Sequence, residues 1–288
     1  MNVHTSQFEA ERPRLTALCY RMLGELASAE DVVQETWLRW QNVHPQEIRD
    51  PAAWLRRAAT NIAIDTLRSA RHRRETYVGP WLPEPLIACH DQPVEEQFEL
   101  AQECELALLW AMERLGPEDR AIFILREAFD ASYREIAETV GKSEAACRQA
   151  VSRAHRHLET AGPRFDAPEH EVEALVSRFF AAVAAEDFVA IKALFAPDAI
   201  AISDGGRKAR AARRVLEGPD EIVHVLMSVW RKAASEPGWC LEPARANLSP
   251  AALRRVDGRI DSVITLAPDS SGQIGWLYVM RNPDKLAS

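Results

Sequence analysis

Apolar residues recur every three to four positions through residues 8–160, and this spacing predicts a series of amphipathic helices. Gly24 ends the first helix and His44-Pro45 interrupts the second. Pro51 occupies the first position of the third, where its missing N–H does no harm. The expected helices cover residues 8–23, 31–42, 51–74, 95–115 and 117–128.

Residues 132–158 carry the pattern of a helix-turn-helix. In its first helix Ile136, Ala137 and Val140 share an apolar face. Gly141 stops that helix in the left-handed conformation that glycine adopts at little cost, and Ser143 caps a second helix. The apolar positions of the second helix follow the 3.6-residue period and are Cys147, Val151, Ala154 and Leu158.

The opposite face of this second helix is polar and basic, which suits a helix in the major groove of DNA. Its residues are Arg148, Gln149, Ser152, Arg153 and Arg156. Arg148 and Gln149 are the candidates for contacts with base edges, and Arg153 and Arg156 for contacts with phosphates. A helical hairpin that does not bind DNA has a similar pattern and is the alternative at this point.

Beyond residue 162 the pattern changes, because strands join the helices. Helices are expected at 169–185, 188–195 and 220–234, and strands at 199–203, 239–248, 252–256, 259–267 and 273–281. This order, with helices first and sheet last, predicts an α+β domain. Four prolines between residues 75 and 94 favour an extended linker before residue 95: Pro80, Pro83, Pro85 and Pro93.

The charge distribution changes the picture, because the chain has a net charge of −8 and still carries a candidate DNA-binding helix. Residues 49–74 hold seven arginines against two aspartates, whereas residues 75–104 hold seven acidic residues and no lysine or arginine. Positive charge is therefore local, and a local patch suffices to release counterions from DNA. The overall sign indicates a protein that does not coat DNA indiscriminately.

The five cysteines are scattered, odd in number and never spaced as CxxC, which favours a reducing compartment and no zinc site. His155 and His157 lie near a helix end without further ligands, so neither metal nor cofactor is expected. We find no signal peptide and no apolar run long enough for a membrane span. The expected protein is soluble and cytoplasmic.

Four motifs in order resemble the extracytoplasmic-function (ECF) sigma factors of the sigma-70 family. They are AEDVVQETWLRW at 29–40, AWLRRAATNIAID at 53–65, LGPEDR at 115–120 and YREIA at 133–137. The resemblance implies region two at 1–74, a linker at 75–94 and region four at 95–162. It also implies an initiation factor without catalytic activity, which binds core RNA polymerase, recognises two promoter boxes and opens the downstream one.

The resemblance assigns roles to three sets of residues. The exposed helix face with Asp31, Gln34, Glu35 and Trp37 would bind the clamp helices of polymerase; a solvated face is the alternative. The basic helix would bind the melted downstream box through Arg56, Arg57, Asn61, Arg68 and Arg71. Trp54 of that helix is more typical of a core position than of a stacking platform. The helix at 144–158 would read the upstream box.

Three further segments resemble signatures of the sigma-J-like subgroup, which carries a C-terminal SnoaL-like domain. They are YVGPWLPEPL at 77–86, DGGRK at 204–208 and RNPDKL at 281–286, with Arg207 where the subgroup has a third glycine. The implied architecture is multidomain: two all-α sigma domains, and residues 168–288 as an α+β cone of the NTF2/ketosteroid-isomerase superfamily. Such a tail would regulate the sigma factor in cis, without a dedicated anti-sigma factor.

We therefore expect these three segments to lie together and to hold the sigma regions at a fixed spacing. The residues are Trp81, Leu82, Pro83, Asp204, Gly205, Gly206, Asn282, Pro283, Asp284, Lys285 and Leu286. A solvated spacer is the alternative. Because such cones can enclose an apolar pocket, a tail that senses a small-molecule ligand stays open. So does an enzyme using Asp204 or Asp187 as a base, although a simple turn at 204–206 is favoured.

Overall fold

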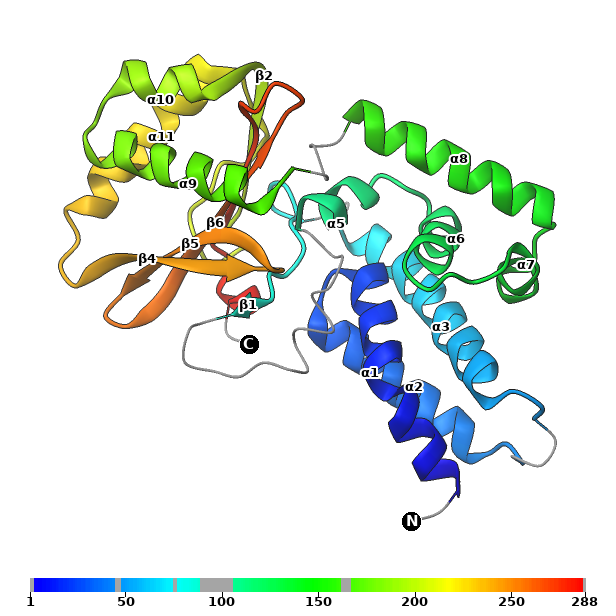
Figure 1. Ribbon diagram of the computed structural model, residues 1–288. Coiled ribbons are helices and arrows are strands. Elements are labelled where there is room, and N and C mark those ends of the chain that lie inside the picture. The colour runs from blue at the N-terminus through cyan, green and yellow to red at the C-terminus, as the bar shows by residue number, and fades with distance from the viewer. Residues whose placement is uncertain (1–2, 45–47, 75–76, 89–105, 162–166, 287–288) are drawn as a thin grey trace. The chain divides into compact units, whose positions relative to one another are not determined.

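The computed structural model describes residues 3–44, 48–74, 77–88, 106–161 and 167–286. The chain divides into two compact units. The first holds the helices before residue 75 and those at 109–161, and the second holds residues 77–88 together with the chain from residue 167 onwards. Figure 1 shows the helical and the mixed unit, and each is described by itself below.

The first unit begins with three packed helices: α1 (Val3–Leu23), α2 (Leu26–Gln41) and α3 (Pro51–Arg74). Their apolar stripes meet at Leu18, Trp40 and Leu55, none of which is exposed. The predicted start of α2 at residue 31 is wrong, because the helix begins directly after Gly24 and an extended Glu25. The start of α3 is as predicted, and the Asp50 carboxylate accepts a hydrogen bond from the Ala53 N–H.

Four further helices belong to the region around the predicted helix-turn-helix. They are α5 (Leu106–Met112), α6 (Pro117–Glu127), α7 (Tyr133–Val140) and α8 (Glu144–Ala161). Helix α6 packs against α7 and α8, and also against α1 and α3. The predicted helix at 95–115 is seen only in its second half, because residues 89–105 lie outside the described part.

The second unit is an α+β domain in which α9 (Glu169–Ala184), α10 (Phe188–Leu194) and α11 (Pro219–Ala234) cover one side of a sheet (Figure 1). Within the described residues, seven strands run in the order β1-β4-β5-β6-β7-β2-β3, and only the β2–β7 pair among them is parallel. Their bounds are β1 Ile87–Ala88, β2 Phe195–Asp204, β3 Leu216–Glu217, β4 Trp239–Ala246, β5 Ser249–Val256, β6 Arg259–Pro268 and β7 Ile274–Met280.

The two faces of this sheet have different partners. Ala201 and Leu277 are paired across β2 and β7 and belong to the core that Phe179, Ile222 and Met227 of the helices complete. Because side chains alternate along a strand, Ile202 and Asp204 point to the other face. That face is also buried, since Ile202, Tyr278 and Met280 are at most 1% exposed.

Part of the linker lies on this second face. Residues 77–88 are not helical, as their prolines predict, and they end in β1, which pairs with β4 in antiparallel register. Strands β1 and β3 have only two residues each, too few to show an alternating pattern, and they were not predicted. The remaining strands are found where predicted, within four residues at each end.

Candidate promoter, polymerase and linker-binding sites

The helix-turn-helix is built by local hydrogen bonds that its sequence encodes. Ser132 and Glu135 form a reciprocal capping box at the start of α7, and the Ser132 hydrogen bond lowers the pKa of Glu135. Gly141 ends α7 with φ +69°, and the Ser143 hydroxyl accepts from the Ala146 N–H to start α8. Both the predicted stop and the predicted cap are present.

Helix α8 presents the predicted residues on its exposed face. Its apolar stripe, Cys147, Val151, Ala154 and Leu158, is buried, whereas all five candidate DNA contacts are exposed. Arg148 pairs with Glu144 at 2.9 Å and lies over the Tyr133 ring at 4.7 Å. Arg153 pairs with Asp119 at 3.2 Å. These contacts are exposed and weak, so phosphates can replace them.

Helix α3 carries the candidates for the downstream box. Arg57 is exposed, Arg56 and Asn61 are half-buried, and the Arg71 side chain lies outside the described part. Arg68 pairs with Asp65 at 2.9 Å and with Glu118 of α6 at 2.5 Å. Trp54 packs on Trp40 at a centroid distance of 5.2 Å, which places it at the edge of the core rather than free for stacking.

The α3 arginines share a pocket with the helix-turn-helix. Arg56 and Arg57 line it from α3, and Glu135 and Glu138 line it from α7. Outside this pocket, Glu118 of α6 accepts a hydrogen bond from Arg68 of α3, and this bond lowers the pKa of Glu118. Acidic side chains therefore face candidate downstream-box arginines in this conformation.

Sequence reasoning missed Arg120, which joins α6 to α1. Its side chain is 1% exposed and donates through Nε and Nη2 to the Arg21 carbonyl, at 3.2 and 2.9 Å. Its third nitrogen pairs with Glu113. The carbonyl lies in the last turn of α1, where helix carbonyls lack partners. A charged residue in a motif gives no sign that it is buried, so the pattern could not show this contact.

The predicted polymerase-binding face lies on α2. Asp31 and Gln34 are exposed, and Glu35 pairs with Arg39 at 2.9 Å. Trp37 is half-buried and packs on Phe8 at a centroid distance of 4.9 Å. The face therefore offers an acidic, hydrogen-bonding surface beside an anchored aromatic ring.

The linker is fixed to the second unit by a buried ion pair. Lys285 Nζ lies 2.9 Å from Asp204 Oδ2, and the two side chains are 6% and 0% exposed. Lys285 also donates to the Leu82 carbonyl at 2.6 Å and lies 4.1 Å from the centroid of the Trp81 ring. We call this group, with Tyr77 and Asn282, the linker clasp.

The other clasp contacts satisfy the Asp204 carboxylate. Oδ1 accepts from the Tyr77 hydroxyl at 2.6 Å and from the Gly206 N–H at 2.9 Å, while Oδ2 accepts from the Leu82 N–H at 3.0 Å. Asn282 donates to the Tyr77 hydroxyl at 2.9 Å. Removing one member of a buried ion pair leaves the other charge buried without compensation, which strongly destabilises the folded protein. Both oxygens of Asp204 therefore already accept hydrogen bonds within the protein. Asp187, the other candidate base, caps α10 by accepting from the N–H groups of Val189 and Ala190.

A second anchor holds the far end of this segment. The Leu86 N–H donates to the Asn247 side-chain oxygen at 3.1 Å, and the Asn247 N–H donates to the Leu86 carbonyl at 2.8 Å. Leu82, Pro83, Glu84, Pro85 and Leu86 are all buried. The structure thus brings the expected segments together at Trp81, Asp204 and Lys285, whereas Pro283 and Asp284 are exposed. Sequence reasoning missed the contacts of Tyr77 and Asn247.

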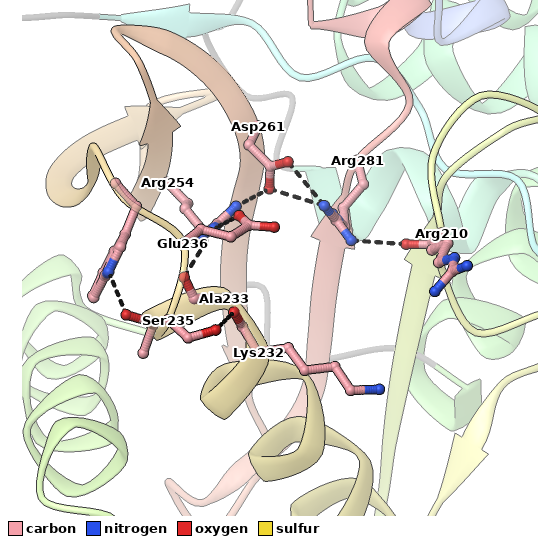
Figure 2. Close-up of polar contacts among 10 residues, drawn as sticks. Arg210, Lys232, Ala233, Ser235, Glu236, Arg254, Asp261 and Arg281 are labelled. Carbon is pink, nitrogen blue, oxygen red and sulfur yellow. Dashed lines mark hydrogen bonds and ion pairs between the residues drawn. The ribbon is translucent and has the colours of Figure 1, made fainter.

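A second polar cluster lies at the end of the sheet that holds Asp204, because the Arg281 N–H donates to the Asp204 carbonyl (Figure 2). Asp261 pairs with Arg254 at 2.7 Å and with Arg281 at 2.8 Å, and Arg281 donates to the Arg210 carbonyl at 2.9 Å. Burial opposes ionisation of Asp261, but the two guanidinium groups hold its pKa below the usual value. Among the described residues no group of acidic, His or Cys side chains could hold a metal ion. No helix there is long and apolar enough to span a membrane.

Comparison with known proteins defines the class of this chain. The family models for sigma-70 region 2 and sigma-70 region 4 match residues 7–73 and 105–158. Together with a relative that is 36% identical over 98% of the chain, they show that it belongs to the ECF RNA polymerase sigma factors. It is therefore a non-enzymatic initiation factor that binds core RNA polymerase and promoter DNA.

That relative is the ECF RNA polymerase sigma factor SigJ of Mycobacterium tuberculosis, and the match covers 93% of its length. The probable ECF RNA polymerase sigma factor SigI of the same species is 27% identical over 98% of this chain and 94% of its own. The crystal structure of SigJ superposes with a TM-score of 0.79 at 31% identity, covering 98% of both chains. The predicted architecture, two helical sigma regions and a C-terminal α+β domain, is confirmed.

Proposed function

We propose that the C-terminal domain regulates this sigma factor in cis by holding the linker between regions two and four. Because the linker is fixed at Tyr77 and at Leu86, a shorter stretch of free chain remains, and the distance between the two regions can vary less. The observation that carries this proposal is the buried Lys285–Asp204 pair, which binds both backbone groups of Leu82. Promoters whose two boxes have one particular spacing would then be favoured.

Three exposed surfaces would perform the sigma function itself. Arg148, Gln149, Ser152, Arg153 and Arg156 would contact the upstream box. Arg56, Arg57, Asn61, Arg68 and Arg71 would contact the melted downstream box. Asp31, Gln34, Glu35 and Trp37 would bind polymerase. Their exposure or half-exposure on single helix faces supports these roles, apart from Arg71, whose side chain lies outside the described part.

We further propose that the protein works in the cytoplasm with polymerase and without a dedicated anti-sigma factor. A fused domain that engages the linker supplies a regulatory element within the chain itself. In a cone-shaped domain a ligand would lie between the helices and the sheet. Here that space contains the side chains of Phe179, Phe195 and Leu277, each at most 3% exposed. This packing favours the linker, rather than a small molecule, as the partner of the domain.

The test is in vitro transcription with core polymerase on promoters whose spacer varies in one-base-pair steps. We expect the wild-type protein to initiate over a narrow range of spacer lengths. Lys285→Met leaves Asp204 buried without its counter-charge, which costs about 3–5 kcal/mol. It should therefore release the linker and broaden the range. Lys232→Met, at an exposed position of α11, is the matched control.

Limited proteolysis of the same variants reports whether residues 77–88 have become accessible. A Lys285→Met protein with an accessible linker and an unchanged spacing profile contradicts regulation through the clasp. Failure of the wild-type protein to initiate from any promoter would contradict the sigma function as a whole.

A further inference from the structure

A basic loop connects β2 to β3 in the C-terminal domain, and the function of regions two and four does not explain it. The basic loop, residues 205–214, contains Arg207, Lys208, Arg210, Arg213 and Arg214 and no acidic residue. All five basic side chains are exposed. In a chain with a net charge of −8, such a concentration of one sign stands out.

Only part of this charge is neutralised within the described residues. Lys208 pairs with Asp284, and Arg214 pairs with Glu221. Arg207, Arg210 and Arg213 have no ion pair with any described carboxylate. Three guanidinium groups are therefore available to an anionic partner.

The backbone of the loop is fixed, which lowers the entropic cost of binding. The Ala209 N–H donates to the Gly205 carbonyl, and the Ala212 N–H donates to the Ser203 hydroxyl, both at 2.9 Å. Arg281 donates to the Arg210 carbonyl, while the Arg210 guanidinium points away from it (Figure 2). The arginines thus extend from an ordered support.

Close packing at the glycines adds to this rigidity. A Cβ on Gly205 would lie 2.3 Å from the Ala209 carbonyl oxygen, and a Cβ on Gly206 would lie 2.8 Å from the Asn282 side chain. Gly206 also has φ +55°. The two glycines allow the chain to fold back tightly before the basic residues begin.

The composition of the loop favours phosphate over a protein partner. Arginine presents planar donors that match phosphate oxygens in pairs. Protein interfaces take their binding energy from buried aromatic and large apolar anchors, and the residues between these arginines are Lys208 and three alanines. The loop offers charge and hydrogen bonds without an apolar anchor.

The loop also touches the linker. A Cβ on Gly79 would lie 3.3 Å from the Cα of Arg213, so the two backbones are in close contact. Gly79 is the fifth residue after Arg74, the end of the arginine-rich helix α3. The loop is therefore held against the segment that joins the two promoter-binding regions.

We propose that the basic loop binds the phosphate backbone of promoter DNA in the initiation complex, independently of base sequence. The C-terminal domain then contributes a third DNA contact, besides those of regions two and four. This inference goes beyond linker regulation, and it rests only on the promoter-binding function of the chain.

The test compares holoenzymes assembled from core polymerase and each sigma variant. The variant Arg207→Gln/Arg210→Gln/Arg213→Gln removes three charges from the loop. The control Arg178→Gln/Lys232→Gln/Arg259→Gln removes three exposed charges elsewhere in the same domain. The affinity for a labelled promoter duplex is measured by fluorescence anisotropy between about 50 and 200 mM salt, the range over which phosphate contacts dominate.

We expect the plot of log affinity against log salt to become less steep by about 0.9 for each phosphate that the loop no longer neutralises, or by about 2–3 for the loop variant. The control should keep the wild-type slope. An unchanged slope in the loop variant overturns the proposal, and so does an equal change in the control. A defect confined to core polymerase binding also overturns it, because the partner is then a protein.

The spacing profile separates this proposal from linker regulation. The loop variant keeps Asp204 and Lys285, so it should keep the wild-type dependence of initiation on spacer length while its salt slope falls. The same thermal midpoint as the control triple variant confirms that the loop variant is folded.

Discussion

At the residue scale, the two polar clusters of the C-terminal domain share one feature: a buried charge meets an opposite charge and further hydrogen bonds. Lys285 and Asp204 show this feature through Tyr77 and Leu82, and Arg254 and Asp261 show it at the other cluster. The sequence could indicate Asp204 and Lys285 only through family motifs. It could not indicate Tyr77 or Arg254 as partners, because pairing depends on strands and loops that are far apart in the chain.

Asp261 allows a prediction about acid stability. Because its pKa is lowered in the folded protein, its contribution is fully present above the unfolded value of about 4. That contribution is lost as the pH falls from there through the folded pKa. Asp261→Asn should therefore lower the free energy of unfolding at pH 7 by about 1.5–3 kcal/mol, the value of hydrogen bonds to a charged group. The difference from wild type should shrink below about pH 4.

Urea denaturation at pH 7, 5 and 3 measures this difference, with each pH chosen relative to the carboxyl reference value of about 4. Asp198→Asn is the control, because Asp198 is an exposed residue of β2. A difference between Asp261→Asn and wild type that stays constant across this range would contradict the assigned role of the ion pairs.

At the element scale, the helices were predicted well because periodicity, caps and proline positions act locally. Pro51, Gly141 and Ser143 mark helix boundaries that the structure reproduces. The strands at the two edges of the sheet were missed because β1 and β3 are short and are defined by pairing with distant chain segments. Family motifs predicted that the segment with Trp81 lies on the C-terminal domain, but the pairing of residues 87–88 with β4 could not be read from the sequence, because it joins distant parts of the chain.

Helix α8 yields a prediction about how the upstream box is read. Gln149 is exposed in mid-helix and has donors and acceptors that match a base edge, whereas Arg153 suits a phosphate. Gln149→Ala should reduce discrimination at a single base pair of the upstream box by about 1–3 kcal/mol. Arg153→Gln should weaken binding to all sequences alike and lower the salt slope by about 1.

Competition between promoter duplexes with a randomised upstream box distinguishes these two outcomes. A Gln149→Ala holoenzyme that loses affinity equally for every sequence would assign Gln149 to the backbone rather than to a base. An Arg153→Gln holoenzyme with altered base preference would assign Arg153 to a base rather than to a phosphate.

At the scale of the whole molecule, an acidic chain can act on DNA because its positive charge is concentrated on separate elements. Helix α3, helix α8 and the basic loop each carry a local excess of arginine. If each element makes a weak contact with DNA, the three together would gain affinity by raising one another's effective concentration. Under the proposed regulation, the linker clasp would limit how far the DNA-binding elements can move independently.

The clasp predicts that the C-terminal domain stays bound after the chain is cut. A protease site placed between Ala161 and Ala167 breaks the covalent connection and leaves residues 77–88 attached to the sigma regions. The buried Lys285–Asp204 pair and the β1–β4 pairing should keep the two fragments together during gel filtration. Lys285→Met removes about 3–5 kcal/mol, which corresponds to at least about 100-fold weaker association.

Dilution of the cut proteins measures this association directly. The cut Lys285→Met protein should separate into two peaks at a concentration where the cut wild type and the cut Lys232→Met control still elute as one. Separation of the cut wild type at every concentration would show that the clasp does not hold the linker in solution. Retention of the Lys285→Met fragments, by contrast, would assign the holding energy to the β1–β4 pairing and to Asn247, and the spacing of the two promoter-binding regions would then depend on that end of the linker.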